Sequence, residues 1–198
     1  MSGTTQVTRE GALALMEEWT ASDSLRKHML AVEAAVAAYA RRYGEDEELW
    51  SVAALLHDFD YERYPNPERD ESGHPYVGVA ELRRRGYPEL VLDAIMGHAD
   101  YTGVRRESLL AKVLYACDEL TGLITAAVLV RPDKDIAGLS LKSVQKKLKD
   151  KAFARGVNRD DVRRGAEELG VELAEHIAFV IEAMQGRAAV LGLDGASG

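Results

Sequence analysis

Apolar residues recur along most of the chain at intervals of three and four, which is the spacing of one face of an α-helix. The pattern is clearest in the segment that follows Ser22, where the apolar positions are Leu25, Met29, Val32, Val36, Tyr39 and Tyr43. Alternation of apolar and polar residues, as in a half-buried β-strand, does not continue for more than a few residues anywhere. The sequence therefore predicts an all-α fold.

Capping residues and helix breakers divide this pattern into separate helices. Ser22 or Asp23 can cap one helix that ends before Gly44, and Asp46 opens the next. A polar loop rich in proline and glycine follows, and Pro88 starts another helix. The expected helices cover approximately residues 8–19, 23–43, 46–58, 75–86, 88–98, 107–130, 141–151, 158–168 and 173–184.

Composition and charge narrow the class of protein. The 198 residues carry a formal net charge of −8, which argues against a general affinity for nucleic acid or for anionic membranes. The single cysteine, Cys117, excludes an internal disulfide, and we interpret it as a small buried apolar residue. We expect a cytoplasmic protein, because the first residues lack the features of a signal peptide and the apolar run near 123–130 is too short to span a bilayer.

Several metal-competent side chains stand at positions where the pattern predicts burial. The apolar run that begins at Trp50 ends in His57 and Asp58, and Asp118 lies in the middle of an apolar helix. Buried carboxylates are costly without a partner, and one shared metal site would neutralise both of them. The six candidate ligands are His28, His57, Asp58, His74, His98 and Asp118. Imidazole and carboxylate donors without a thiolate suit manganese, iron, zinc, cobalt or nickel.

The order His28, His57-Asp58, Asp118 resembles the H…HD…D signature of the HD-domain superfamily, and the resemblance covers residues 22–130. It implies an HD-domain helical bundle at 22–130, preceded by an N-terminal helix at 1–21. A helical extension at 131–198 would pack on that domain. His74 and His98 look like the two extra histidines of HDIG-type members with a dinuclear site. In such a site Asp58 would bridge two divalent ions; His28, His57 and Asp118 would complete one site, and His74 and His98 the other.

The segment Gly86-Tyr87-Pro88 is similar to the tripeptide of the HD-GYP subgroup, which cleaves cyclic dinucleotides. In that subgroup the tripeptide follows a double histidine, whereas here it precedes the single His98. We interpret the tripeptide as a helix boundary, and its position argues against a cyclic-dinucleotide substrate.

The resemblance implies a metal-dependent phosphohydrolase that cleaves a small, nucleotide-like phosphomonoester or phosphodiester with a metal-activated water. Asp58 and Asp118 would be the catalytic carboxylates. Cations near the site would stabilise the transition-state charge on phosphorus. The candidates for substrate binding are Arg26, Arg63, Lys142 and Lys146, with Lys27 and Lys149 beside them.

Two other functions remain open at this point. Myo-inositol oxygenase, a helical HD protein, uses the same four histidines and two aspartates to hold two irons and activate oxygen. The second alternative is a regulator that binds a nucleotide without catalysing a reaction. Asp60 and Glu62 are either groups that support the site or loop surface residues, and His176 is expected on a helix surface. The oligomeric state is not predicted.

Overall fold

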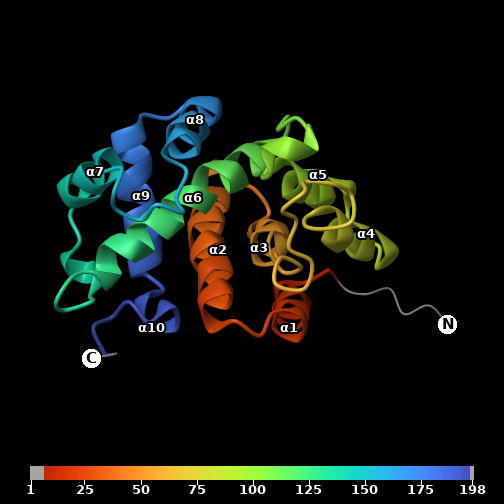
Figure 1. Ribbon diagram of the computed structural model, residues 1–198, viewed down its shortest axis with the longest axis horizontal. Helices are drawn as coiled ribbons and strands as arrows, with labels where there is room; N and C mark the ends of the chain where they lie inside the picture. The colour runs from red at the N-terminus through yellow and green to blue at the C-terminus, as the bar shows by residue number, and fades with distance from the viewer. Residues whose placement is uncertain (1–6, 197–198) are drawn as a thin grey trace. The chain divides into compact units, whose positions relative to one another are not determined.

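The computed structural model describes residues 7–196 of the chain. Over this range it contains ten α-helices and two short 3-10 helices, and no β-strand (Figure 1). The predicted all-α fold is confirmed. None of the described helices has both the length and the hydropathy that crossing a bilayer requires.

The chain divides into two compact units, residues 1–114 and 115–198, and the boundary lies inside helix α6. The described part of the first unit holds α1 (Arg9–Trp19), α2 (Asp23–Tyr43), α3 (Glu47–Leu56), α4 (Tyr76–Arg84), α5 (Glu89–Gly97), η1 (Asp100–Thr102) and the start of α6 (Leu109–Leu129). The second holds the rest of α6, then η2 (Ile136–Gly138), α7 (Leu141–Lys149), α8 (Arg159–Leu169), α9 (Leu173–Gln185) and α10 (Ala188–Leu191). The expected division at residue 130 stays a prediction.

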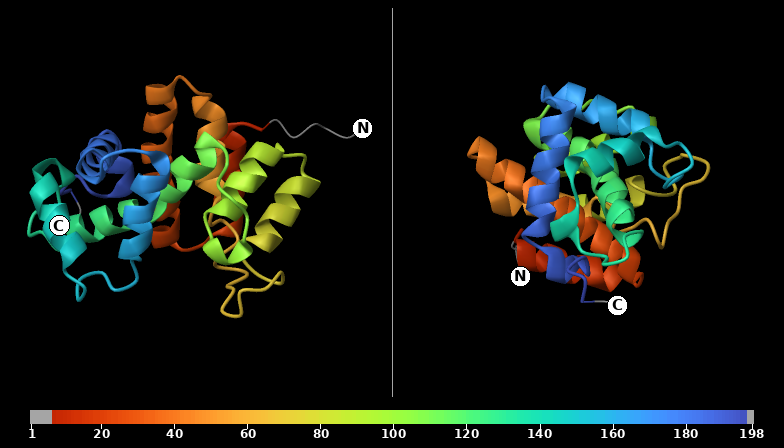
Figure 2. Two further views of the ribbon diagram at one scale, coloured as in Figure 1. Left: turned by 90° about the horizontal axis from the view of Figure 1, so that it is seen from above. Right: turned by 90° about the vertical axis from the view of Figure 1, so that its left-hand side faces the viewer.

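Helix α3 is the central element of the first unit. It packs against α1, α2 and α5, and α4 in turn lies beside α5 (Figure 2). All seven residues from Trp50 to Leu56 are buried, so this part of the helix is enclosed on every side. Such a helix is stable only inside a core, and its end is therefore held in a fixed place by the neighbouring helices.

The predicted helix ends are set by local hydrogen bonds. The Ser22 hydroxyl accepts the Leu25 N–H at 3.3 Å at the start of α2, and Asp46 Oδ1 accepts the Leu49 N–H at 3.0 Å at the start of α3. Gly44 ends α2 with a φ of 72°, a conformation that favours glycine. These are the caps and the stop that the sequence predicts.

In the second unit, α7, α8 and α10 each pack on α9. Val144 and Leu148 of α7 are buried, whereas Lys142, Lys146 and Lys149 are exposed, as the helical pattern predicts.

The interpretation of His176 as a helix-surface residue is wrong. Its side chain on α9 is fully buried, and Nε2–H donates to the Ala116 carbonyl at 2.8 Å. Burial lowers the pKa of His176, although the bond to Ala116 acts in the opposite direction. The acidic residues beside it in the sequence suggested a solvated face, but the partner of His176 lies 60 positions away in the chain.

Candidate metal centre

The end of α3 carries the first two candidate ligands. His57 caps the C-terminus of the helix and is fully buried, and Asp58 follows where the chain leaves the helix. The Nδ1–H of His57 donates to the Ala54 carbonyl at 2.7 Å. This bond places the proton on Nδ1 and leaves the Nε2 lone pair to face away from α3.

The other three histidines of the first unit come from separate segments. His28 lies on α2, His74 precedes α4, and His98 caps the C-terminus of α5. The Nδ1–H of His98 donates to the Ile95 carbonyl, one turn back along the helix, as His57 does on α3. The His74-Pro75 peptide bond is cis.

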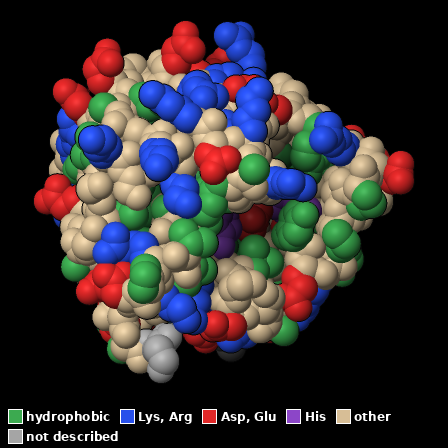
Figure 3. Space-filling model, turned by 60° about the vertical axis from the view of Figure 1, so that its left-hand side comes forward, with side chains coloured by type: hydrophobic (Ala, Val, Ile, Leu, Met, Phe, Trp, Pro, Cys, Tyr) green, Lys and Arg blue, Asp and Glu red, His purple; other side chains and the backbone are tan. Residues whose placement is uncertain are grey.

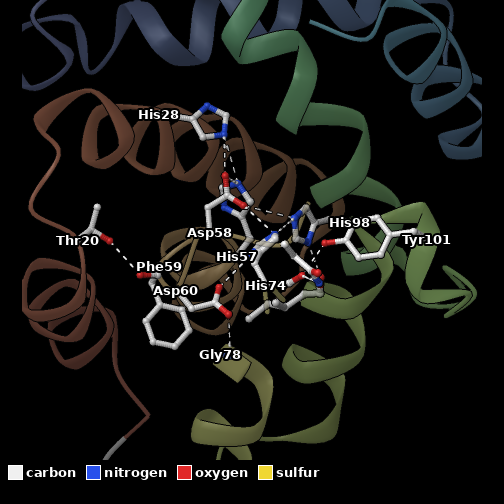
Figure 4. A network of polar contacts seen from close by, with 12 residues as sticks. Thr20, His28, His57, Asp58, Phe59, Asp60, His74, Gly78, His98 and Tyr101 are labelled. Carbon is white, nitrogen blue, oxygen red and sulfur yellow. Dashed lines mark hydrogen bonds and ion pairs between the residues drawn. The ribbon is translucent and has the colours of Figure 1, made fainter. Parts of the chain in front are cut away.

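The four imidazoles gather around the carboxylate of Asp58 in two pairs (Figure 4). Asp58 Oδ2 lies 3.8 Å from His28 Nε2 and 3.6 Å from His57 Nε2. Asp58 Oδ1 lies 3.3 Å from His74 Nε2 and 3.4 Å from His98 Nε2. Within the pairs, the two Nε2 atoms are 3.3 Å apart for His28 and His57, and 3.2 Å apart for His74 and His98. Each oxygen of Asp58 therefore faces its own pair of imidazole nitrogens.

These separations fit metal coordination. Bonds of about 2.1 Å to a tetrahedral ion place neighbouring ligand atoms about 3.4 Å apart, close to the distances around Asp58. Two groups of ligand atoms, each within 4.8 Å of one another, could each hold an ion; they are His28, His57 and Asp58, and Asp58, His74 and His98. With the proton on Nδ1, His57 and His98 each turn an unprotonated Nε2 toward the centre, as a metal ligand requires.

Histidines also dominate the electrostatics of Asp58. Burial by itself raises the pKa of the Asp58 carboxyl, but His57, His98 and His74 in their protonated forms together outweigh burial and hold the pKa well below its usual range. Part of the group is open to solvent, since the side chains of His28 and Asp58 are 24% and 18% exposed. The space-filling view shows histidine and acidic side chains at the floor of a hollow (Figure 3).

Of the two interpretations that the sequence left open for Asp60, the structure supports the one that ties it to the site. The side chain is buried, and its Oδ1 accepts the Nδ1–H of His74 at 2.7 Å. The Tyr101 hydroxyl donates to the His74 carbonyl at 2.6 Å. Burial, followed by the charge of Asp60, raises the pKa of Tyr101 to about 12, so this hydroxyl keeps its proton.

The candidate substrate-binding arginines make contacts at the end of α1. Arg26 donates to the Thr20 and Glu17 carbonyls, both at 2.6 Å, and Arg63 donates to the Glu18 carbonyl. These bonds satisfy carbonyls that the helix itself leaves without partners. A role for Arg26 and Arg63 in substrate binding stays a prediction.

Glu62 has a structural role at the same place. Its Oε2 accepts the backbone N–H groups of Ala21 and Ser22, at 3.0 and 2.9 Å. The carboxylate thus joins the loop after α3 to the start of α2.

Three candidates lie in the second unit. Asp118 is partly exposed on α6, and its backbone carbonyl accepts the Thr121 hydroxyl at 2.9 Å. Lys142 and Lys146 are on α7. Their participation in the site stays a prediction. Cys117 is buried, as expected, and burial raises the pKa of its thiol.

Arg69 is a residue that sequence reasoning missed. It lies in the loop before α4, where its guanidinium carbon is 5.8 Å from the centre of the Tyr101 ring. Asn66 ties this loop to the site, because its amide donates to the Asp70 and His74 carbonyls, each at 2.7 Å. Among the described residues, no carboxylate pairs with Arg69. No local sequence pattern distinguishes it from the other surface arginines.

Fold and site together define an all-α protein with histidine–carboxylate groups suited to divalent metal ions. The sequence model of the HD domain matches residues 25–123, half of the chain and a range that includes all six predicted ligands. The chain therefore belongs to the HD-domain family. Members are mostly metal-dependent phosphohydrolases, so membership supports an enzyme of that general kind. Comparison with curated proteins and with solved structures gives no match.

Proposed function

We propose that the protein is a phosphohydrolase that holds two divalent ions on its four clustered histidines and Asp58. The substrate is a small phosphomonoester or phosphodiester, and Asp118 completes one of the two ion sites as the family signature implies.

The observation that carries the proposal is the arrangement of Asp58. Its two oxygens face different pairs of imidazole nitrogens, at 3.6–3.8 Å on one side and 3.3–3.4 Å on the other. A carboxylate in this position could coordinate one ion with each of its oxygens. The bonds from His57 to Ala54 and from His98 to Ile95 keep the Nε2 atoms unprotonated and turned toward Asp58.

Two divalent ions bound at such a site supply an activated water and neutralise charge on the attacking and leaving oxygens of a phosphoryl transfer. The chain provides the rest of the environment. The Asp58 carboxylate places negative charge between the two ion sites, with one oxygen directed to each site. His28 and Asp58 are the more exposed ligands, so substrate approaches on their side, whereas His57 is closed off from solvent.

Arg69 is the cation that we assign to the substrate. Its guanidinium carbon lies over Tyr101, 5.8 Å from the ring centre, and this cation–π contact favours one position of a long side chain. An arginine fork matches the oxygens of a phosphate group. Tyr61 is half-exposed and its ring lies 5.2 Å from that of His74, so it offers an aromatic surface beside the site for a nucleotide-like substrate.

The test is hydrolysis by protein stripped with a chelator and reloaded with Mn²⁺. We expect release of p-nitrophenol from p-nitrophenyl phosphate or bis(p-nitrophenyl) phosphate, at the same rate with and without oxygen. Asp58→Asn is expected to lower kcat/KM by at least about 100-fold, because a preorganised charge at the reacting centre is lost. The matched control is Asp93→Asn, which makes the same change at an exposed position of α5.

Two results would contradict the proposal. Hydrolysis that is equally fast in Asp58→Asn and wild-type protein would show that the phosphatase activity does not come from this site. Iron-dependent turnover that needs oxygen, without release of p-nitrophenol, would instead identify the oxygenase alternative.

A further inference from the structure

Asp60 is a buried carboxylate between two hydrogen-bond donors (Figure 4). Its Oδ1 accepts the Nδ1–H of His74 at 2.7 Å, and its Oδ2 accepts the backbone N–H of Gly78, also at 2.7 Å. Gly78 lies in the first turn of α4, where backbone N–H groups have no partner within the helix. Pro75, at the N-cap position, makes no side-chain cap. Asp60 therefore caps α4 from a distant segment and orients His74 at the same time.

Gly78 is the residue that allows this approach. A Cβ atom at position 78 would lie 2.6 Å from Asp60 Cγ, 2.7 Å from Asp60 Oδ2 and 2.8 Å from a ring carbon of Phe59. Any side chain there would push the carboxylate away from α4. The fit between Asp60 and Gly78 fixes the carboxylate against His74.

His74 differs from His57 and His98 in the acceptor of its Nδ1–H group. His57 and His98 donate their Nδ1–H groups to backbone carbonyls of their own helices, so their orientation does not depend on another side chain. The Nδ1–H of His74 depends on the side chain of Asp60. We infer that Asp60 is the positioning residue for the subsite formed by Asp58, His74 and His98, and that this subsite can be lost without the other one. This inference rests on the proposed two-ion function.

Hydrogen-bond chemistry predicts what the substitution Asp60→Asn would do. A carboxylate has two acceptor oxygens and can satisfy both donors, whereas a carboxamide has one acceptor oxygen and an NH₂ group. The Gly78 N–H can only donate, so the oxygen of the introduced amide would turn to it and the NH₂ would face His74. His74 would then accept at Nδ1 and carry its proton on Nε2, the nitrogen that faces Asp58 and His98. A protonated Nε2 cannot bind a metal ion.

The experiment is titration of metal-free protein with Co²⁺, followed by visible absorption and by metal analysis after desalting. Wild-type protein is expected to bind two Co²⁺ ions per chain. Asp60→Asn is expected to bind one with unchanged affinity and the second about 10–100-fold more weakly, the usual effect of losing the partner of a ligand histidine. The control is Glu62→Gln in the same loop, because an amide oxygen can still accept the Ala21 and Ser22 N–H groups.

A purely structural role as a helix cap would lower stability without changing the number of bound ions. Two Co²⁺ ions bound by Asp60→Asn with wild-type affinities would therefore overturn the inference. Fewer than two ions in wild-type protein would instead contradict the proposed function. If Asp60→Asn does not fold, Gly78→Ala displaces the same carboxylate and is expected to weaken binding of the same ion.

A second measurement needs no variant. In nitrogen-15 NMR spectra of metal-free wild-type protein, His74 is expected to carry its proton on Nδ1. A proton on Nε2 instead would overturn the inference whatever the variants do.

Discussion

Removal of divalent ions is expected to lower the thermal stability of the protein. In the folded chain the four imidazoles and Asp58 converge, with paired Nε2 atoms 3.2–3.3 Å apart. The unfolded chain does not hold these groups together, because they come from four segments spread over positions 28 to 98. An ion that binds the folded chain and not the unfolded one stabilises the folded state through mass action.

The magnitude follows from the number of sites. At a free ion concentration of about 100 times Kd, one ion contributes about 2.7 kcal/mol, and two independent ions about 5.4 kcal/mol. For a chain of this length, each kcal/mol corresponds to a change in Tm of about 2–4 °C. Saturation with Mn²⁺ is therefore expected to raise Tm by roughly 11–22 °C above that of the chelated protein.

The assay is thermal unfolding followed by circular dichroism at 222 nm, with EDTA or with excess Mn²⁺. Asp58→Asn is expected to lose nearly all of the Mn²⁺-induced rise in Tm, since both ion sites use an oxygen of Asp58. Asp93→Asn is expected to keep the full rise. If Asp58→Asn keeps it as well, the stabilising ions bind somewhere else and the assignment of this cluster as the metal centre is refuted.

Three further predictions concern the rest of the molecule. Leu56→Ala, at a fully buried position of α3, is expected to lower the free energy of unfolding by about 2–5 kcal/mol in urea denaturation; a change within about 0.5 kcal/mol would contradict the central place of α3. Arg84, with Arg85, lowers the pKa of Glu81 to about 2. The ionised Glu81 carboxylate therefore stabilises the fold fully above the pKa that Glu81 has in the unfolded chain, and this stabilisation is lost as pH falls toward about 2. The unfolding free energies of wild-type protein and Glu81→Gln should differ by about 1 kcal/mol at neutral pH, a value reduced for solvent screening, and should converge in acid. Arg69→Ala is expected to raise KM for p-nitrophenyl phosphate about 10-fold with little change in Tm, and an unchanged KM would remove Arg69 from the substrate site.

The helices could be predicted because their signals are local. The hydroxyl of Ser22 and the carboxylate of Asp46 reach N–H groups three residues ahead, and Gly44 ends a helix through its own backbone conformation. Interactions between residues this close in the chain can be predicted from the sequence, because both partners belong to the same short segment. The same holds for the exposed lysines of α7, whose positions follow from the helical period.

The family signature made the candidate ligands recognisable, but it did not distinguish the residues that support them. Asp60 and Glu62 looked equivalent in the loop after α3. In the folded chain Asp60 holds His74, and Glu62 holds the start of α2. Both partners are separated from these carboxylates by many residues, so no spacing rule relates them.

From the sequence alone came the helical class, the approximate bounds of the first nine helices and the set of histidines and aspartates that could bind metal. Only the tertiary structure decided that Asp58 faces one imidazole pair with each oxygen, that Asp60 reaches across to α4, and that His176 is buried. The physical reason is that hydrophobic periodicity specifies which face of a helix turns inward and not which segment it meets. A hydrogen bond between residues 18 or 60 positions apart exists only after the core has brought the two segments together.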